Sequence, residues 1–145
     1  MKKRPSKARS GPRRQARELV LQMLFQADLG KQSAEEVRKS FWRERGEIDE
    51  EVRTFADDIF GIAMTRAAEI DAVIAGRAQN WRLERMPAVD RNLLRAAVAE
   101  LLGYPDTASA IVINEAIEVA HKYSSPESVN FINGVLDAAA KELRK

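Results

Sequence analysis

Apolar residues recur at intervals of three and four positions along most of the 145-residue chain. This spacing places them on one face of an α-helix, whereas a half-buried strand would need the strict alternation that we do not find. The pattern therefore predicts an all-α fold of six or seven helices bundled around the third. The expected helices cover 13–29, 33–43, 50–76, 88–102, 108–123 and 126–143, with a short connector or single turn at 81–86.

The predicted helix boundaries coincide with residues that satisfy free backbone groups. Ser33 with Glu36 three residues later is a capping-box pattern, and Ser125 followed by Pro126 is typical of a helix start. Asp49 is a candidate cap for the third helix. At 1.5 Å per residue that helix would be on the order of 40 Å long, enough to cross the molecule.

The predicted first helix has apolar residues on two sides. One stripe, which should face the core, contains Ala16, Val20, Met23 and Ala27. Leu21 and Phe25 fall nearly opposite that stripe, within about 40° of Arg14. The helix is therefore either buried on both sides or presents a contact face that is apolar at one end and basic at the other. On the last helix, Phe131 lies beside the core stripe with Glu127 four residues before it, and both core packing and exposure remain open.

Charge divides the chain into a basic head and an acidic body. The first 17 residues contain eight basic residues and no acidic one, so the remaining 128 carry 16 basic and 22 acidic residues. A head of +8 on a body of −6 usually indicates a polyanionic partner, although a solubilising tail has the same composition. Residues 1–12 combine basic residues with proline, serine and glycine and show no apolar period. We expect a flexible basic tail there, followed by a single helical domain over 13–145.

The sequence lacks the residue patterns of common catalytic and metal sites. It has no cysteine, which excludes disulfides, thiolate metal sites and a cysteine nucleophile, and fits a reducing cytoplasm. The single histidine, His121, cannot form a metal cluster, and neither a glycine-rich phosphate loop nor a G-x-S-x-G motif is present. No apolar run reaches the roughly 18 residues of a membrane span. We therefore expect no catalytic residue, metal or cofactor, and no role as an enzyme or a membrane protein.

The basic head suits nucleic acid better than a lipid surface. Arg13, Arg14 and Arg17 cluster at the start of the first helix, and the arginine fork makes bidentate, charge-assisted bonds to phosphate. Tyr123 is an aromatic residue that could stack on the bases of a single strand. The tail contains no tryptophan, phenylalanine or leucine to insert into lipid. The predicted RNA-binding residues are therefore Arg13, Arg14, Arg17 and Tyr123.

Four motifs occur in order along the chain. They are Arg13-Arg14-Gln-Ala-Arg17-Glu18, Asp90-Arg-Asn-Leu-Leu-Arg95 followed by Ala-Glu100-Leu, Ile113-Asn-Glu115-Ala-Ile-Glu-Val-Ala120, and Phe131-Ile-Asn133-Gly134-Val-Leu136-Asp137. Through them, residues 13–143 resemble the NusB family of bacterial transcription antitermination factors. The last two motifs are highly specific, whereas the arginine-rich start alone would be weak.

The resemblance implies two small helical bundles that bind the single-stranded boxA element of nascent ribosomal leader RNA. It implies a heterodimer with the small-subunit ribosomal protein NusE, which joins the elongating RNA polymerase with other Nus factors and suppresses termination in rRNA transcription. Position by position, the arginines of the first motif fall in the family's RNA-contacting segment. The residues that match the ribosomal-protein face are Phe25, Asp90, Glu127 and Phe131. We add Leu21, which shares the off-core stripe with Phe25.

Two positions depart from the family pattern. Gln15 interrupts the arginine block, and Phe25 stands where a tyrosine is familiar, so any hydrogen bond of that hydroxyl is lost. Two other hypotheses remain open. One is a helical homodimeric interaction module with a nonspecific basic tail, and the other is a NusB-like domain of an rRNA methyltransferase system. A homodimer is also compatible with the leading hypothesis, as a storage form that hides the RNA face.

Overall fold

The computed structural model describes residues 5–78 and 82–144, with side chains from residue 11 onward, and its secondary structure over these residues is helical, with no strand. This confirms the predicted all-α fold of about seven helices. The elements are α1 (Pro5–Gly30), α2 (Ala34–Arg45), α3 (Glu50–Thr65), α4 (Ala67–Arg77), a single 3₁₀ turn η1 (Leu83–Arg85), α5 (Ala88–Gly103), α6 (Ser109–Tyr123) and α7 (Pro126–Leu143). Part of the predicted connector at 81–86 lies outside the described residues.

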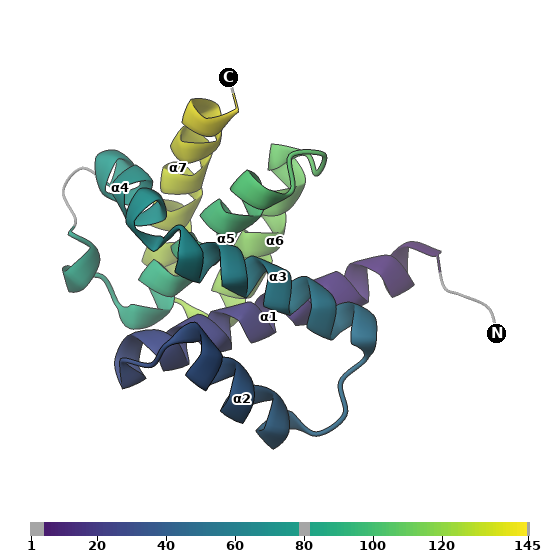
Figure 1. The fold of residues 1–145 in the computed structure, drawn as a ribbon. Coiled ribbons are helices and arrows are strands. Elements are labelled where there is room, and N and C mark those ends of the chain that lie inside the picture. The colour runs from purple at the N-terminus through teal and green to yellow at the C-terminus, as the bar shows by residue number, and fades with distance from the viewer. Residues whose placement is uncertain (1–4, 79–81, 145) are drawn as a thin grey trace.

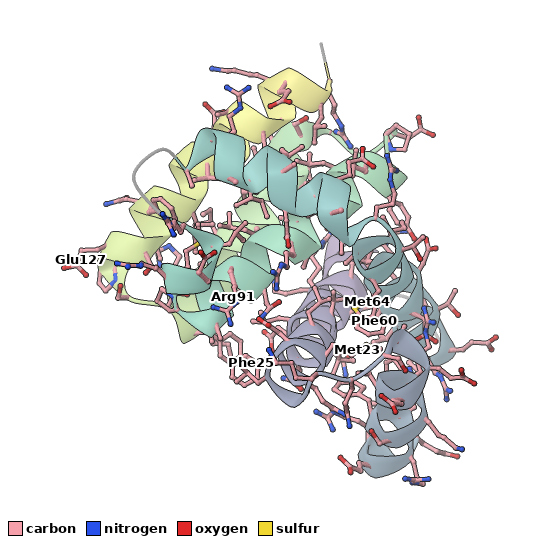
Figure 2. All side chains as sticks on the ribbon, turned by 60° about the vertical axis from the view of Figure 1, so that its left-hand side comes forward. Met23, Phe25, Phe60, Met64, Arg91 and Glu127 are labelled. Atoms are coloured by element: carbon pink, nitrogen blue, oxygen red, sulfur yellow. The ribbon has the colours of Figure 1, made fainter. Side chains whose placement is uncertain are left out.

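The helices form two groups that share α1 and α3 as their boundary. In Figure 1, α2 lies on one side of α1 and α3, and α4 to α7 lie on the other. The helix α1 packs against α3 and α5, and it also contacts α2 and α6. In Figure 2, Met23, Phe60 and Met64 gather between α1 and α3, where the first two are fully buried. The long first helix is therefore the element that joins the two groups.

The prediction of one long third helix is wrong, because the segment is two helices that meet at Arg66. At that residue the backbone leaves helical geometry, with φ −106° and ψ 29°. No residue between Ala63 and Ile70 is buried, so the apolar period lapses there. The bend lets α3 pack on α1 and α5 while α4 turns to cover α5 and α7. One straight helix could not serve both surfaces.

The first helix begins at Pro5, not at the predicted Arg13, and it contains Pro12. Proline suits the first turn of a helix, because the N–H groups there have no intrahelical partner. This applies to Pro5, whereas Pro12 lies inside the helix, where it removes one backbone hydrogen bond and its ring crowds the carbonyl four residues before it. The boundary prediction failed because it treated this proline as a stop. That residues 1–12 form a flexible tail stays a prediction.

Two of the three predicted helix caps form. The backbone N–H of Glu36 donates to Ser33 Oγ at 3.1 Å, and the N–H of Ser33 donates to Glu36 Oε1 at 2.9 Å. The N–H of Ser128 donates to Ser125 Oγ at 3.1 Å. The prediction for Asp49 is wrong, because its side chain makes no capping bond.

Candidate nucleic-acid interface

Two of the three predicted arginines bind glutamates on neighbouring helices. Arg14 donates through Nε and Nη2 to the two carboxylate oxygens of Glu115 on α6, at 2.9 and 2.8 Å. Arg17 donates in the same way to Glu100 on α5, at 2.8 and 2.5 Å. A weaker contact of 3.4 Å joins Arg17 Nη1 to Glu115. The four side chains thus form one ionic network that ties α1 to the second group of helices.

The two pairs differ sharply in burial. The Arg14 side chain is 43% exposed, whereas the side chains of Arg17 and Glu100 are only 10% and 3% exposed. The hydrogen bond from Arg14 lowers the pKa of Glu115, which keeps that carboxylate charged against the cost of burial. Arg14 can therefore contact a ligand at the surface, whereas the Arg17 side chain is buried against Glu100.

Arg13 has a different environment. Its guanidinium lies 4.2 Å from the centroid of the Phe55 ring and 5.9 Å from that of Tyr104. Within the described part of the chain, no carboxylate forms an ion pair with it. A cation over an aromatic face keeps its N–H groups available at the ring's edge. Arg13 is thus held in place without being neutralised.

Tyr123 lies on the same interface between α1 and α6 as Arg14. Its hydroxyl donates to Glu18 Oε1 at 3.3 Å, and Lys122 Nζ donates to the same carboxylate at 3.1 Å. Glu18 follows Arg14 by one turn of α1, so the structure brings Tyr123 near the arginine segment. Lys122 thus forms an ion pair across the two helices with Glu18. The Tyr123 ring remains partly exposed, as stacking requires.

The predicted partner residues on α1 separate into one that is exposed and one that is buried. Phe25 is 37% exposed and lies one turn before the exposed Leu29, whereas Leu21 is only 3% exposed. Placing Leu21 on a contact face is therefore wrong. The helix α1 lies between α3 and α5, so both of its apolar stripes are covered along most of its length. Only the C-terminal end of the second stripe reaches the surface.

The other three predicted partner residues meet at a groove between α5 and α7. The α5–α7 groove has a volume of about 500 Å³, and its lining includes Met86, Pro87, Asp90, Glu127, Ser128 and Phe131. Asp90 is buried and accepts hydrogen bonds from Ser124 Oγ at 2.8 Å and Ser128 Oγ at 2.6 Å. Glu127 is exposed and Phe131 is half-buried. Asp90 thus fixes the floor of the groove, while Glu127 and Phe131 can face a partner.

An ionic cluster that the sequence did not reveal links Phe25 to this groove. Asp28 accepts from Arg91 Nε at 2.7 Å and from Asn92 Nδ2 at 2.9 Å, and Arg95 joins it at 3.3 Å. Burial would raise the pKa of Asp28, but the hydrogen bonds from Arg91 and Asn92 lower it. In Figure 2, Arg91 lies close to Phe25, with Glu127 farther along the same side. Helical spacing cannot pair residues more than 60 positions apart, so only the fold reveals this cluster.

The described residues contain no group of three or more histidine, cysteine, aspartate or glutamate side chains that could hold a metal ion. His121 is exposed on α6. In the part of the chain that the structure describes, none of the helices has the length and apolar character that a membrane crossing needs.

The fold and its surfaces define a class of small helical protein with arginines at one end of its first helix and a groove of mixed apolar and polar lining near the other. The chain belongs to the NusB family, whose family model matches residues 14–141. A relative from Koribacter versatilis is 58% identical over 135 residues, which cover 93% of this chain and 92% of that protein. One from Sorangium cellulosum is 46% identical and covers 92% and 94%. Both are named transcription antitermination protein NusB.

Solved structures agree with this family. NusB from T. maritima is 34% identical, with a TM-score of 0.81 over 90% of this chain and 91% of that one. A chain in the crystal structure of antitermination factors NusB and NusE in complex with dsRNA is 26% identical. Its TM-score is also 0.81, over 91% of this chain and 98% of that chain.

Proposed function

We propose that this chain is a transcription antitermination factor that binds boxA RNA of ribosomal RNA leader transcripts together with the ribosomal protein NusE, and so suppresses termination. The observation that carries the proposal is family membership over residues 14–141. A partly exposed arginine pair, Arg13 and Arg14, in the segment where the family's RNA contacts are expected supports it. A similar chain occurs in a complex with NusE and dsRNA.

The RNA face consists of Arg13, Arg14 and Tyr123 in this proposal. Arg14 uses Nε and Nη2 on Glu115, which leaves donors on Nη1 for a phosphate, because a guanidinium carries five N–H groups. Glu115 thereby holds the arginine fork in one orientation before RNA arrives, which reduces the entropy lost on binding. Arg17 serves as a positioning residue that anchors this part of α1 through Glu100.

The NusE face consists of Phe25 and the α5–α7 groove. Phe25 offers an exposed ring at the end of α1, and Phe131 and Glu127 border the groove. Buried aromatic anchors with a polar rim are typical of tight protein interfaces. Asp90 contributes by holding Ser124 and Ser128 at the junction of α6 and α7.

The wider assembly is the elongating RNA polymerase with other Nus factors, and the cytoplasm is the expected compartment. The matched relatives are named as transcription antitermination proteins and not as enzymes. This favours the proposal over a part in an rRNA methyltransferase system. A homodimer would be a storage form, and sedimentation with and without RNA separates it from a heterodimer.

The direct test is binding of the full chain to a boxA-containing RNA and to a scrambled RNA of equal length, each with and without NusE. Preference for boxA that strengthens with NusE is the expected result. Equal binding to both RNAs, with and without NusE, would reject the proposal. A single-stranded and a duplex form of the boxA RNA show which of the two is bound.

A further inference from the structure

A pocket beside Arg13 is not explained by phosphate binding. This pocket, called the α1–α3 pocket here, has a volume of about 440 Å³. Its lining consists of Arg13, Glu50, Glu51, Thr54, Phe55 and Tyr104. Because the lining includes two carboxylates beside the arginine proposed to contact RNA, the pocket suits a ligand group that carries hydrogen-bond donors.

One wall of the pocket is a set of planar groups. The Phe55 and Tyr104 rings meet edge to face, with centroids 5.1 Å apart and planes at 69°. The Arg13 guanidinium covers the Phe55 ring, and the Tyr104 hydroxyl donates to Asp58. Because Phe55 is buried, a ligand meets Arg13 and the half-buried Tyr104. Guanidinium planes and tyrosine rings are the surfaces on which proteins stack unpaired bases.

A second wall, also formed by α3, carries two exposed carboxylates, Glu50 and Glu51, in the first turn of that helix. Neither takes part in an ion pair within the described part of the chain. A carboxylate only accepts hydrogen bonds, so this wall repels a phosphate and attracts an edge with N–H groups. Guanine carries two adjacent donors, N1–H and N2–H₂, on its Watson–Crick edge. Uracil and adenine place an acceptor beside their single donor group and fit less well.

We propose that the α1–α3 pocket binds one unpaired guanine base of the RNA strand. The base stacks against Arg13 and Tyr104, and its Watson–Crick edge donates to Glu50 or Glu51. This inference rests on the proposed function, since Arg13 and its neighbour Arg14 bring the strand to the pocket. It supplies sequence preference where phosphate contacts alone supply none.

The test replaces each guanine of a boxA-containing RNA in turn by inosine, which lacks only the N2 amino group. For the wild-type chain with NusE, one position should weaken binding roughly tenfold, the loss of one hydrogen bond to a charged acceptor. In the double variant Glu50→Ala/Glu51→Ala, guanine and inosine should bind equally at that position. The matched control is Glu44→Ala/Glu47→Ala, which removes two exposed carboxylates outside the pocket and should keep the discrimination. Circular dichroism checks that both variants are folded.

The outcomes separate the two proposals. Preference for boxA over scrambled RNA without any inosine effect overturns the guanine pocket and leaves the proposed function intact. An inosine effect that persists in Glu50→Ala/Glu51→Ala, or that disappears equally in the control, also overturns the pocket. Loss of all preference for boxA in the wild-type chain rejects the proposed function itself.

Discussion

The pair Arg14–Glu115, whose arginine reaches the surface, and the buried pair Arg17–Glu100 lie side by side, and they use the same bidentate geometry. They differ in solvent access, because the Arg14 side chain is 43% exposed and the Arg17 side chain 10%. An exposed ion pair adds little to stability and can exchange partners. A buried pair cannot lose one member without leaving a charge unpaired. Burial, rather than residue type, therefore separates the arginine that can bind a ligand from the arginine that stabilises the fold.

Removal of the buried carboxylate should have the largest effect on stability. Glu100→Ala should lower the free energy of unfolding by about 3–5 kcal/mol, because it leaves Arg17 charged and without its main partner. Urea unfolding followed by circular dichroism measures the loss. The matched variant Glu115→Ala should cost less, about 1 kcal/mol, because Arg14 is partly solvated and Arg17 keeps its bidentate bond to Glu100. Equal losses for the two variants would contradict the assigned roles.

Leu21 and Phe25, which share the second apolar stripe of α1, show the same contrast between a buried and an exposed residue at the partner end. Leu21→Ala should destabilise the chain by about 2–5 kcal/mol, because it leaves a cavity in the core. Phe25→Ala should leave the helical signal intact and weaken binding to NusE roughly tenfold, as expected for an aromatic anchor. Calorimetry with NusE, combined with thermal unfolding, separates the two effects. Strong destabilisation by Phe25→Ala would place that ring in the core.

Replacement of the exposed arginine should affect RNA much more than folding. Arg14→Ala should weaken boxA binding and make the slope of log K against log salt shallower by about 0.7, the value for one single-strand phosphate. The free energy of unfolding should fall by less than about 1 kcal/mol. Fluorescence titrations at several salt concentrations measure the slope. An unchanged slope would remove Arg14 from the phosphate contacts.

Local sequence patterns predicted what depends on local spacing. The capping box at Ser33 and the start of α7 at Ser125 follow from residues three positions apart, whereas the period of α1 left open whether Phe25 is exposed. The burial of Leu21 could not be predicted, because it depends on α3 and α5 packing on both sides of α1. The carboxylates that bind Arg14 and Arg17 lie 101 and 83 positions away along the chain. The cluster of arginines therefore predicted positive charge, but it did not predict which arginine is buried in an ion pair and which remains accessible to solvent.

The smallest expected effect is the pH dependence of the Arg14–Glu115 pair. The hydrogen bond from Arg14 lowers the pKa of Glu115 below its ordinary value of 4.5, so the unfolded chain binds this proton at a higher pH than the folded chain. The pair therefore stabilises the fold above about pH 4.5, and the contribution is lost as the pH falls through the lowered pKa. Arg14→Ala removes the main cause of the lowered pKa and leaves the weaker effect of the Arg17 charge. The difference in unfolding free energy between wild type and Arg14→Ala should thus be constant near neutral pH and shrink below pH 4.5. Asp28 is present in both proteins, so its contribution to the pH dependence cancels in this difference. Urea unfolding between pH 7 and pH 3 measures this difference, and a difference that does not change with pH would show that the Arg14–Glu115 pair does not form in solution.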